Sequence, residues 1–219
     1  MSPKYEHLKS LFDFAVSFIA SIFLLIPMCI IAVMIIMHDF GNPLFFQKRV
    51  GKSGKNFYIV KFRSMTRNAD NLEKTLSKEE IELYKKEYKL KDDPRLIGWK
   101  NRSKNGNCFG LLLRQYSIDE LPQILFNVLI FRNMSIVGPR PILPEELEEN
   151  YTAEEQAELL SVKPGITGYW QAFGRNMIQY ENHKRQDMEL YYVRSRSPKL
   201  DLNILLHTVS SVLCKTGAL

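Results

Sequence analysis

Cysteine and histidine are scarce in this chain of 219 residues, and neither is arranged as a recognisable metal site. The three cysteines, Cys29, Cys108 and Cys214, are far apart and show no Cys-x-x-Cys spacing. This excludes a disulfide framework and a zinc site of the usual ligand spacing. The four histidines are equally dispersed, as is typical of surface or helix-packing residues. We therefore expect a reducing, cytosolic environment, in which all three cysteines are packing residues.

Nucleotide-binding and nucleic-acid-binding motifs are also missing. The glycine-rich segment GKSGK, at 51–55, lacks the GxxxxGK[ST] spacing of a Walker loop. The chain carries 30 Lys+Arg against 24 Asp+Glu, a net charge of +6, which suits a negatively charged partner such as nucleic acid, anionic lipid or a nucleotide. Because no nucleic-acid motif accompanies this charge, a membrane-tethered nucleic-acid binder is the least favoured class, and we expect no nucleic-acid partner.

The sequence does contain one long uncharged run near its N-terminus. Residues 14–37 form an apolar run of 24 residues without a charge. As a straight helix, the run would reach roughly 36 Å, and a bilayer core is about 30 Å thick. It is too long for the apolar part of a signal peptide. We expect a retained membrane helix with its flanks over residues 1–43, and a cytosolic domain at the membrane surface over residues 44–219.

The proline near the centre of this run makes its topology uncertain by sequence alone. Pro27 deletes a backbone hydrogen bond and predicts a kink. Positive charge lies on both flanks, and the positive-inside rule would place both ends in the cytoplasm. A helix that enters the membrane, breaks at Pro27 and returns satisfies this pattern, whereas a kinked full span remains the alternative. The flanking cations are Lys4, Lys9, Lys48, Arg49, Lys52 and Lys55.

The rest of the chain predicts an α+β fold that is predominantly helical. Two aromatic and β-branched runs on either side of GKSGK predict a small β-hairpin. The polar segment 98–107 predicts a surface loop. Helical patterns cover 67–92, which is strongly charged, 109–116 and 121–131. After Ser197-Pro198 an amphipathic helix is expected, which either packs on the domain or lies on the membrane surface. Its apolar face comprises Leu202, Leu205, Val209, Val212 and Leu213.

Two adjacent carboxylates, Asp119 and Glu120, stand out in the otherwise apolar segment that follows Arg114. Pro122 belongs in a first helical turn, so Asp119 is explained by helix capping alone if it is the N-cap residue. A helix start also suits phosphate, provided that cations intervene between phosphate and carboxylates. The basic candidates for binding phosphate are Lys61, Arg63, Arg114, Arg140 and Arg175, and Mg²⁺ held by the two carboxylates would serve the same purpose.

Several blocks, taken together, resemble one known family. These are FFQKRVGKSGKNFYIVKFRSM, GLLLRQYSIDELPQILFNVL, MSIVGPRP, VKPGITGYWQAFGRN and YYVRSRSPKLDLNILLHTV. In this order they resemble the bacterial sugar transferase family, the monotopic phosphoglycosyl transferases, and the match covers nearly the whole chain. The family commonly has Ser-Pro at the break of its membrane helix, whereas here Ile26 precedes Pro27. The segment 98–107 looks like an insertion relative to the family.

The resemblance implies an enzyme that moves a sugar-1-phosphate from a UDP-sugar to polyprenol (undecaprenyl) phosphate, with Mg²⁺ as cofactor. Asp119 would be the nucleophile that forms an aspartyl phosphosugar, and Glu120 its neighbour in the dyad, with both as metal ligands. The resemblance further implies a monotopic protein of the bacterial cytoplasmic (inner) membrane, with the catalytic domain on the cytoplasmic face, that initiates surface polysaccharide or glycoconjugate synthesis.

One alternative and two details stay open at this point. A membrane-surface assembly protein on the same fold would bind lipid phosphate without turnover, although the intact Asp119–Glu120 pair weighs against it. The donor sugar is not readable from one sequence, because selectivity depends on pocket shape and a few hydrogen bonds. The oligomeric state is equally open, a homo-oligomer included.

Overall fold

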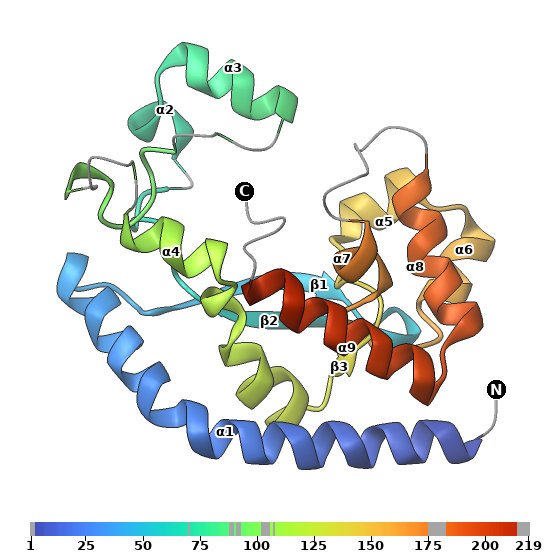
Figure 1. The fold of residues 1–219 in the computed structure, drawn as a ribbon. Helices are drawn as coiled ribbons and strands as arrows, with labels where there is room; N and C mark the ends of the chain where they lie inside the picture. The colour runs from blue at the N-terminus through green and yellow to red at the C-terminus, as the bar shows by residue number, and fades with distance from the viewer. Residues whose placement is uncertain are drawn as a thin grey trace.

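A helix of 37 residues, α1 (Pro3–Asp39), runs along one side of the whole molecule in the computed structural model (Figure 1). The structure describes residues 3–69, 71–87, 90, 93–101, 106, 108–174 and 183–213. Among these, α1 is the only helix long and apolar enough to cross a membrane by length and composition. Figure 1 shows two arms that meet at a bend. Pro27 inside the helix is the physical reason, since proline removes a backbone N–H and clashes with the preceding turn.

The surface of α1 is the reverse of what a helix in a soluble protein shows. Its polar residues face the protein, and Asp13, Ser17 and Ser21 are at most 9% exposed. Large apolar side chains point outward instead, with Phe23 and Ile26 at 75% and 71% exposed. Such a contiguous apolar surface is stable against lipid and unfavourable in water. The side-chain distribution of α1 therefore suits a membrane-embedded helix.

The β-hairpin that follows α1 confirms the two predicted strands. β1 (Leu44–Val50) pairs with β2 (Asn56–Phe62) in an antiparallel register that aligns Phe45 with Lys61. Opposed residues share a face of the sheet, and so do residues two apart along a strand. Arg49 and Lys61 therefore lie on the same face of the hairpin.

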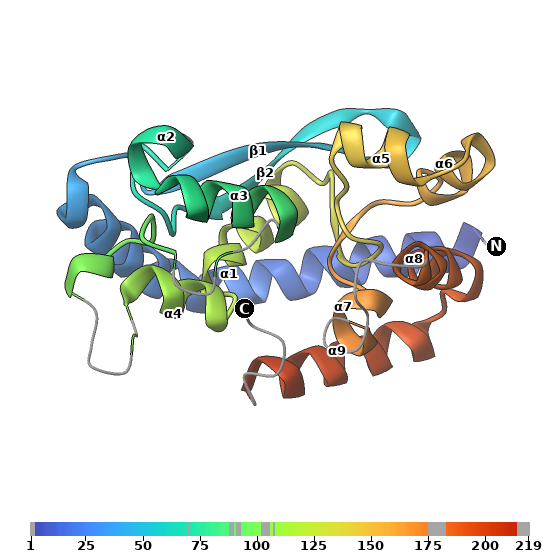
Figure 2. The same cartoon turned by 90° about the horizontal axis from the view of Figure 1, so that it is seen from above.

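The remaining elements are mostly short helices, which gather at the two ends of the hairpin (Figures 1 and 2). The predicted charged helical region 67–92 contains α2 and α3, and the predicted helices over 109–116 and 121–131 correspond to α4 and η4. Of the predicted loop and insertion over 98–107, residues 102–105 and 107 lie outside the described part of the chain. The elements are η1 (Lys52–Gly54), α2 (Leu72–Thr75), α3 (Lys78–Glu87), η2 (Trp99–Asn101), α4 (Phe109–Gln115), η3 (Ile118–Glu120), η4 (Ile124–Ile130), α5 (Pro144–Asn150), α6 (Ala153–Leu159), α7 (Tyr169–Phe173), α8 (Lys184–Ser195) and α9 (Pro198–Leu213).

Two short parallel strands, which the sequence analysis did not identify, hold the GPRP segment in place. β3 (Ser135–Val137) pairs with β4 (Gly165–Thr167), and the chain enters GPRP directly after β3. A Cβ atom on Gly165 would lie 2.0 Å from the backbone N of Gly138. Glycine is therefore required at this close approach of two backbones. The contact between these two backbones places Arg140 beside α5 and α8.

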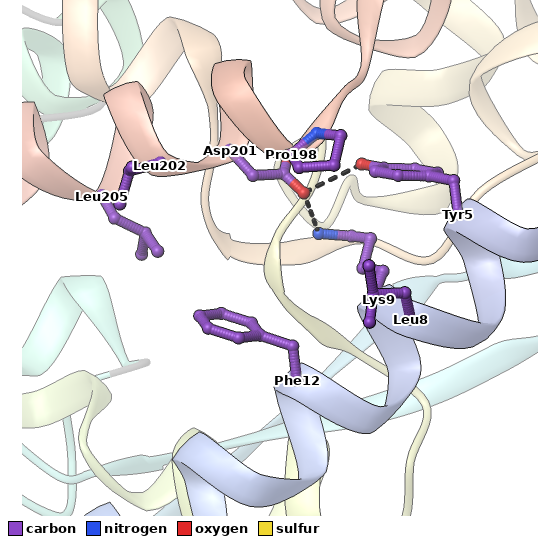
Figure 3. Close-up of a pocket in the computed structure, with 8 residues that line it drawn as sticks. All are labelled: Tyr5, Leu8, Lys9, Phe12, Pro198, Asp201, Leu202 and Leu205. Atoms are coloured by element: carbon purple, nitrogen blue, oxygen red, sulfur yellow. Dashed lines mark hydrogen bonds and ion pairs between the residues drawn. The ribbon is translucent and has the colours of Figure 1, made fainter.

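The start of α9 is joined to the start of α1 through one carboxylate, that of Asp201. Tyr5, Lys9 and Tyr192 each donate a hydrogen bond of 2.8 Å to it. Figure 3 shows Tyr5 and Lys9 converging on Asp201 beside a groove of about 320 Å³, whose other side chains are apolar. Because both helices contribute to this network, it fixes the N-terminal arm of α1 to α9 and, through Tyr192, to α8.

The predicted apolar face of α9 is divided: Leu202 and Val209 point outward, whereas Leu205 is partly buried and packs against the core. Leu202 and Val209 are each 58% exposed, whereas Ile204, which was not among the predicted apolar face, is fully buried. The side chains of Val212 and Leu213 lie outside the described part of the structure. Packing on the domain, the first of the two alternatives for this face, is therefore wrong for Leu202 and Val209.

Candidate active site

Asp119 lies inside a short 3-10 turn, η3, and not at the N-cap of a helix. The turn begins after Ser117, which is left-handed with φ of 54° and ψ of 24°. In this segment, neither Ser117 nor Gln123, the residues that precede η3 and η4, makes a side-chain capping hydrogen bond. The prediction that Asp119 caps a helix is therefore wrong, because the chain reverses at Ser117, before the aspartate. Capping does not explain this carboxylate.

Strand β2 brings Lys61 against the second acid of the pair. The Nζ atom of Lys61 donates a hydrogen bond of 2.6 Å to Oε1 of Glu120. The two side chains are 23% and 34% exposed, so solvent reaches this ion pair only in part. A lysine predicted to bind phosphate and one member of the predicted dyad are thus in direct contact.

The Asp119 carboxyl is poorly solvated, and this changes its pKa. Burial raises the pKa of Asp119 to about 6, and the neighbouring Glu120 charge adds to the rise in pKa. The charges of Lys61 and Arg114 act in the opposite direction and lower this pKa. A carboxylate that is ionised near neutral pH yet weakly hydrated is typical of a reactive group in an enzyme site.

Arg114, at the end of α4, faces the strand that carries Lys61. Its Nε atom donates a hydrogen bond of 3.2 Å to Oγ of Ser64, which is buried just beyond the end of β2. This contact holds α4 beside β2. The structure thus gathers Lys61, Arg114, Asp119 and Glu120 in one place, although three different elements carry them.

Arg63 lies close by in sequence, but its guanidinium is directed to the end of α1. It forms a bidentate ion pair with Asp39, with N–O distances of 2.6 and 2.5 Å, and its Nε atom donates to the carbonyl oxygen of Asn42 at 2.8 Å. Bidentate arginine–carboxylate pairs are among the stronger polar contacts in proteins. In this structure Arg63 anchors the C-terminal end of α1, and its predicted contact with phosphate stays a prediction.

Arg140 belongs to a second group of charged residues, formed by the GPRP segment, α5 and α8. Its backbone N–H donates to Oε2 of Glu189 at 3.0 Å, and its Nη1 atom lies 3.3 Å from Oε1 of Glu146. Arg185 also pairs with Glu146. Glu189 is only 2% exposed, and burial raises its pKa to about 7. Glu146, Arg185 and Glu189 were not predicted from the sequence, because no motif marks them as site residues.

Arg49 links the two groups. It is 6% exposed, and its Nη1 atom donates to the carbonyl oxygen of Pro141 at 3.2 Å. Burial, followed by the nearby charge of Arg140, lowers the pKa of Arg49 to about 10, while the charge of Glu120 acts to raise that pKa. The sequence analysis placed Arg49 only among the flanking cations. Strand alternation would have found it, because Arg49 and Lys61 share a face of the predicted hairpin.

Two remaining site predictions are only partly visible. Pro27, the predicted break of the membrane helix, lies inside α1, which continues from Pro3 to Asp39. Arg175, predicted to bind phosphate, lies outside the described residues.

The residues present fit a magnesium ion that is shared with a substrate. In the described part of the chain, no group of three or more His, Cys, Asp or Glu side chains is arranged to hold a metal. Mg²⁺ keeps several waters and is commonly bound by one or two carboxylates together with substrate phosphates. Asp119 and Glu120 supply two hard oxygen ligands of this type, so they suit a metal that arrives with a diphosphate.

Comparison with known proteins decides the family. The model of the bacterial sugar transferase family matches residues 4–215. The chain belongs to this family. The match includes α1 as well as the Asp119 and Arg140 regions, so the long apolar helix and the charged site both lie within the family model.

Individual relatives differ in length. A UDP-galactose-lipid carrier transferase of Erwinia amylovora and an undecaprenyl-phosphate galactose phosphotransferase of Salmonella typhimurium are each 37% identical over 96% of this chain, but each match covers only 41% of the relative. The chain therefore spans about two fifths of the length of these relatives. A sugar transferase of Bacillus subtilis, EpsL, is 41% identical over 214 residues, which are 96% of this chain and 89% of the relative.

Proposed function

We propose that this chain transfers a sugar-1-phosphate from a UDP-sugar to polyprenol phosphate, at the cytoplasmic face of a bacterial inner membrane, as the initiating step of surface polysaccharide or glycoconjugate synthesis. The Lys61–Glu120 ion pair beside the poorly solvated Asp119 carries this proposal. The names of the Erwinia and Salmonella relatives, which specify UDP-galactose, a lipid carrier and undecaprenyl phosphate, support the substrate classes.

The reaction follows from a carboxylate nucleophile. An oxygen of Asp119 attacks the sugar-bearing phosphorus of the donor, and the bond from that phosphorus to the bridging oxygen breaks, so UMP leaves with the electron pair. An oxygen of the lipid phosphate then attacks the same phosphorus and breaks its bond to Asp119. The product is a polyprenol diphosphosugar, and the aspartate is restored. An acyl phosphate is reactive enough for this second displacement, which splits one transfer between two anions into two steps.

The basic residues have distinct places in this scheme. Lys61 holds Glu120 in position and partly offsets the negative charge of the dyad. Arg114 is placed to neutralise phosphate charge on the side of α4, and Arg140 on the side of the GPRP segment. Groups already in position where charge develops stabilise a transition state without reorganisation.

Magnesium is part of the same proposal. When bound, Mg²⁺ neutralises diphosphate charge and assists departure of UMP. Asp119 and Glu120 would hold it, and Lys61 fixes the orientation of one of these ligands through its hydrogen bond to Oε1 of Glu120.

The nucleophile can be identified by trapping. We would incubate the detergent-solubilised protein with Mg²⁺ and UDP-glucose, UDP-galactose or a UDP-N-acetylhexosamine, without acceptor, and digest it with trypsin. Cleavage after Arg114 and Arg132 releases one peptide that contains both Asp119 and Glu120. We expect this peptide to gain the mass of a phosphosugar, and fragmentation to place it on Asp119. Acceptor should discharge it, with UMP measured in parallel.

Matched variants complete this test. Asp119→Asn should lose both the adduct and UMP release, whereas Asp119→Asn protein should still unfold at a temperature close to that of the unsubstituted protein. An adduct on Glu120, or equal UMP release from Asp119→Asn, would overturn the assignment of the nucleophile. Absence of UMP release with every donor would overturn the proposed function itself.

We also propose that α1 enters the membrane and returns to the same side. The two ends of the helix support this topology, because both are held by the same domain. Near its start Lys9 pairs with Asp201, and at its end Asp39 pairs with Arg63. A helix anchored in this way at both ends keeps them on one face of the bilayer, and the bend at Pro27 permits it. The outward apolar face of α9 would then rest on the membrane surface.

Topology is tested by cysteine labelling. His7→Cys and Phe45→Cys, both at exposed positions, would be introduced singly after the three native cysteines are replaced by serine. A membrane-impermeant thiol reagent added to intact and to inverted vesicles should label both positions from the cytoplasmic side only. Labelling of the two positions from opposite sides would mean a full span.

A further inference from the structure

We propose that Asn127 is a positioning residue that sets Lys61 against Glu120, an inference that rests on the proposed function for its consequence in catalysis. Asn127 lies in the π-helix η4, and its side chain is fully buried. Its residue type is unexpected there, because every other residue from Ile124 to Ile130 is apolar. A buried amide is costly unless its donors and acceptor are paired.

The amide of Asn127 is paired with the backbone of β2. Its Oδ1 atom accepts a hydrogen bond of 2.9 Å from the N–H of Val60, and its Nδ2 atom donates one of 2.7 Å to the carbonyl oxygen of Tyr58. These two groups belong to the edge of β2 that faces away from β1, since β1 and β2 form a sheet of two strands. The side chain therefore takes the place that a third strand would occupy.

This pairing connects the strand that carries Lys61 to the helix that follows Glu120. Lys61 is the residue directly after Val60, and Glu120 belongs to the turn that leads into η4. The Asn127 amide thus fixes the position of β2 along η4. In this way it also fixes where Nζ of Lys61 meets Oε1 of Glu120. A further bond of 3.1 Å from Nδ2 to Oδ1 of Asn133 keeps the amide in this orientation.

Removing the amide leaves two backbone groups without this partner, the buried N–H of Val60 and the partly buried carbonyl of Tyr58. In Asn127→Ala, Val60 N–H and Tyr58 C=O have to find water or move. Either change lets β2 shift along η4, and Lys61 moves with it. Replacing a residue that only filled space would not move Lys61. Measuring the reactivity of the Lys61 amine therefore separates a positioning role of Asn127 from a space-filling role.

The first experiment tests the contact between Lys61 and Glu120 without measuring turnover. Acylation of lysines by a soluble activated ester is followed by mass spectrometry, with exposed Lys52 in the same molecule as reference. Lys61 should react slowly in the unsubstituted protein and roughly tenfold faster in Asn127→Ala, the factor expected for loss of a hydrogen bond to a charged group. Glu120→Gln, which removes the partner, should raise the rate of Lys61 to a similar extent.

The second experiment reads catalysis through a double-mutant cycle. Asn127→Ala should lower kcat for UMP release by at least about tenfold, and should have no further effect when Lys61→Met is already present, because both act through one contact. Val128→Ala is the matched control, since it truncates a similarly buried side chain of the same helix, 3% exposed against 0% for Asn127, and leaves the amide in place. It should lower the unfolding temperature without changing kcat or the acylation of Lys61.

The outcomes separate this inference from the proposed function. Unchanged acylation of Lys61 in Asn127→Ala, additive effects of Asn127→Ala and Lys61→Met, or equal effects of Val128→Ala would each overturn it. If Asn127→Ala does not fold, Asn133→Ala removes one bond to the amide and should give a smaller rise in acylation, and no rise would overturn the inference. Absence of UMP release by the unsubstituted protein would count against the proposed function alone, since the acylation result stands without it.

Discussion

The Nζ atom of Lys61 lies 2.6 Å from Oε1 of Glu120, a contact between residues 59 positions apart in the chain. It joins the hairpin to the turn that carries Asp119. Because the pair is partly buried, its attraction is less screened than that of a surface salt bridge. The contact therefore both orients Glu120 and alters the electrostatics of its neighbour.

Replacement of Lys61 should affect turnover far more than stability. We expect Lys61→Met to lower kcat/KM for UMP release by about 10²–10³, because a positioned charge next to the reacting phosphate is lost. Lys61→Arg, which keeps the charge but changes the geometry, should retain more activity. Lys52→Met, on the exposed hairpin turn, serves as the control and should behave like the unsubstituted protein. Equal activities of Lys61→Met and Lys52→Met would contradict this role.

Chelation should stop the reaction. Excess EDTA is expected to abolish UMP release, and added Mg²⁺ to restore it, since two carboxylates alone cannot neutralise a diphosphate. Glu120→Gln should need more Mg²⁺ for half-maximal rate, because one hard oxygen ligand is replaced by an amide. A titration of initial rate against Mg²⁺ measures both effects. Full activity in excess EDTA would show that the metal is not required.

The Arg63–Asp39 pair should act on stability through α1. Arg63→Ala and Asp39→Asn are each expected to lower the free energy of unfolding by about 1–3 kcal/mol, and the double variant by much less than the sum. Thermal and denaturant unfolding in detergent measure this. If Arg63 instead serves chiefly as a donor-phosphate ligand, Arg63→Ala will raise KM for the UDP-sugar whereas Asp39→Asn will leave it unchanged.

Glu189 makes stability depend on pH. Burial raises its pKa to about 7, from an ordinary value of 4.5, although the charges of Arg140 and Arg185 oppose this rise. The unfolded chain releases this proton more readily than the folded chain, so the contribution of Glu189 to folding weakens as the pH rises from about 4.5 to about 7. Glu189→Gln should flatten the loss of stability across this range. Unfolding curves at several pH values test this, and an unchanged slope would contradict it.

Local signals account for the parts of the fold that the sequence predicted correctly. The hairpin was predictable because two aromatic and β-branched runs on either side of a glycine-rich turn specify it over residues 44–62 without help from elsewhere. The same holds for the helical periods of α4 and α9. The prediction that Asp119 caps a helix was wrong because Pro122 restricts its own backbone but does not determine where the preceding turn begins. That turn begins after Ser117, whose left-handed conformation no local pattern indicated.

The sequence by itself determined the family, the long apolar helix with its proline, and the presence of two acids among basic residues, because composition and short motifs carry these directly. Only the tertiary structure decided which partners meet. Lys61 pairs with Glu120 and Arg63 with Asp39, although the two basic residues are almost adjacent. The physical reason is packing. Strand alternation puts residues two apart on the same face, but Lys61 lies within β2, where η3 packs, whereas Arg63 lies beyond the end of β2, where α1 ends, and no local pattern specifies those neighbours.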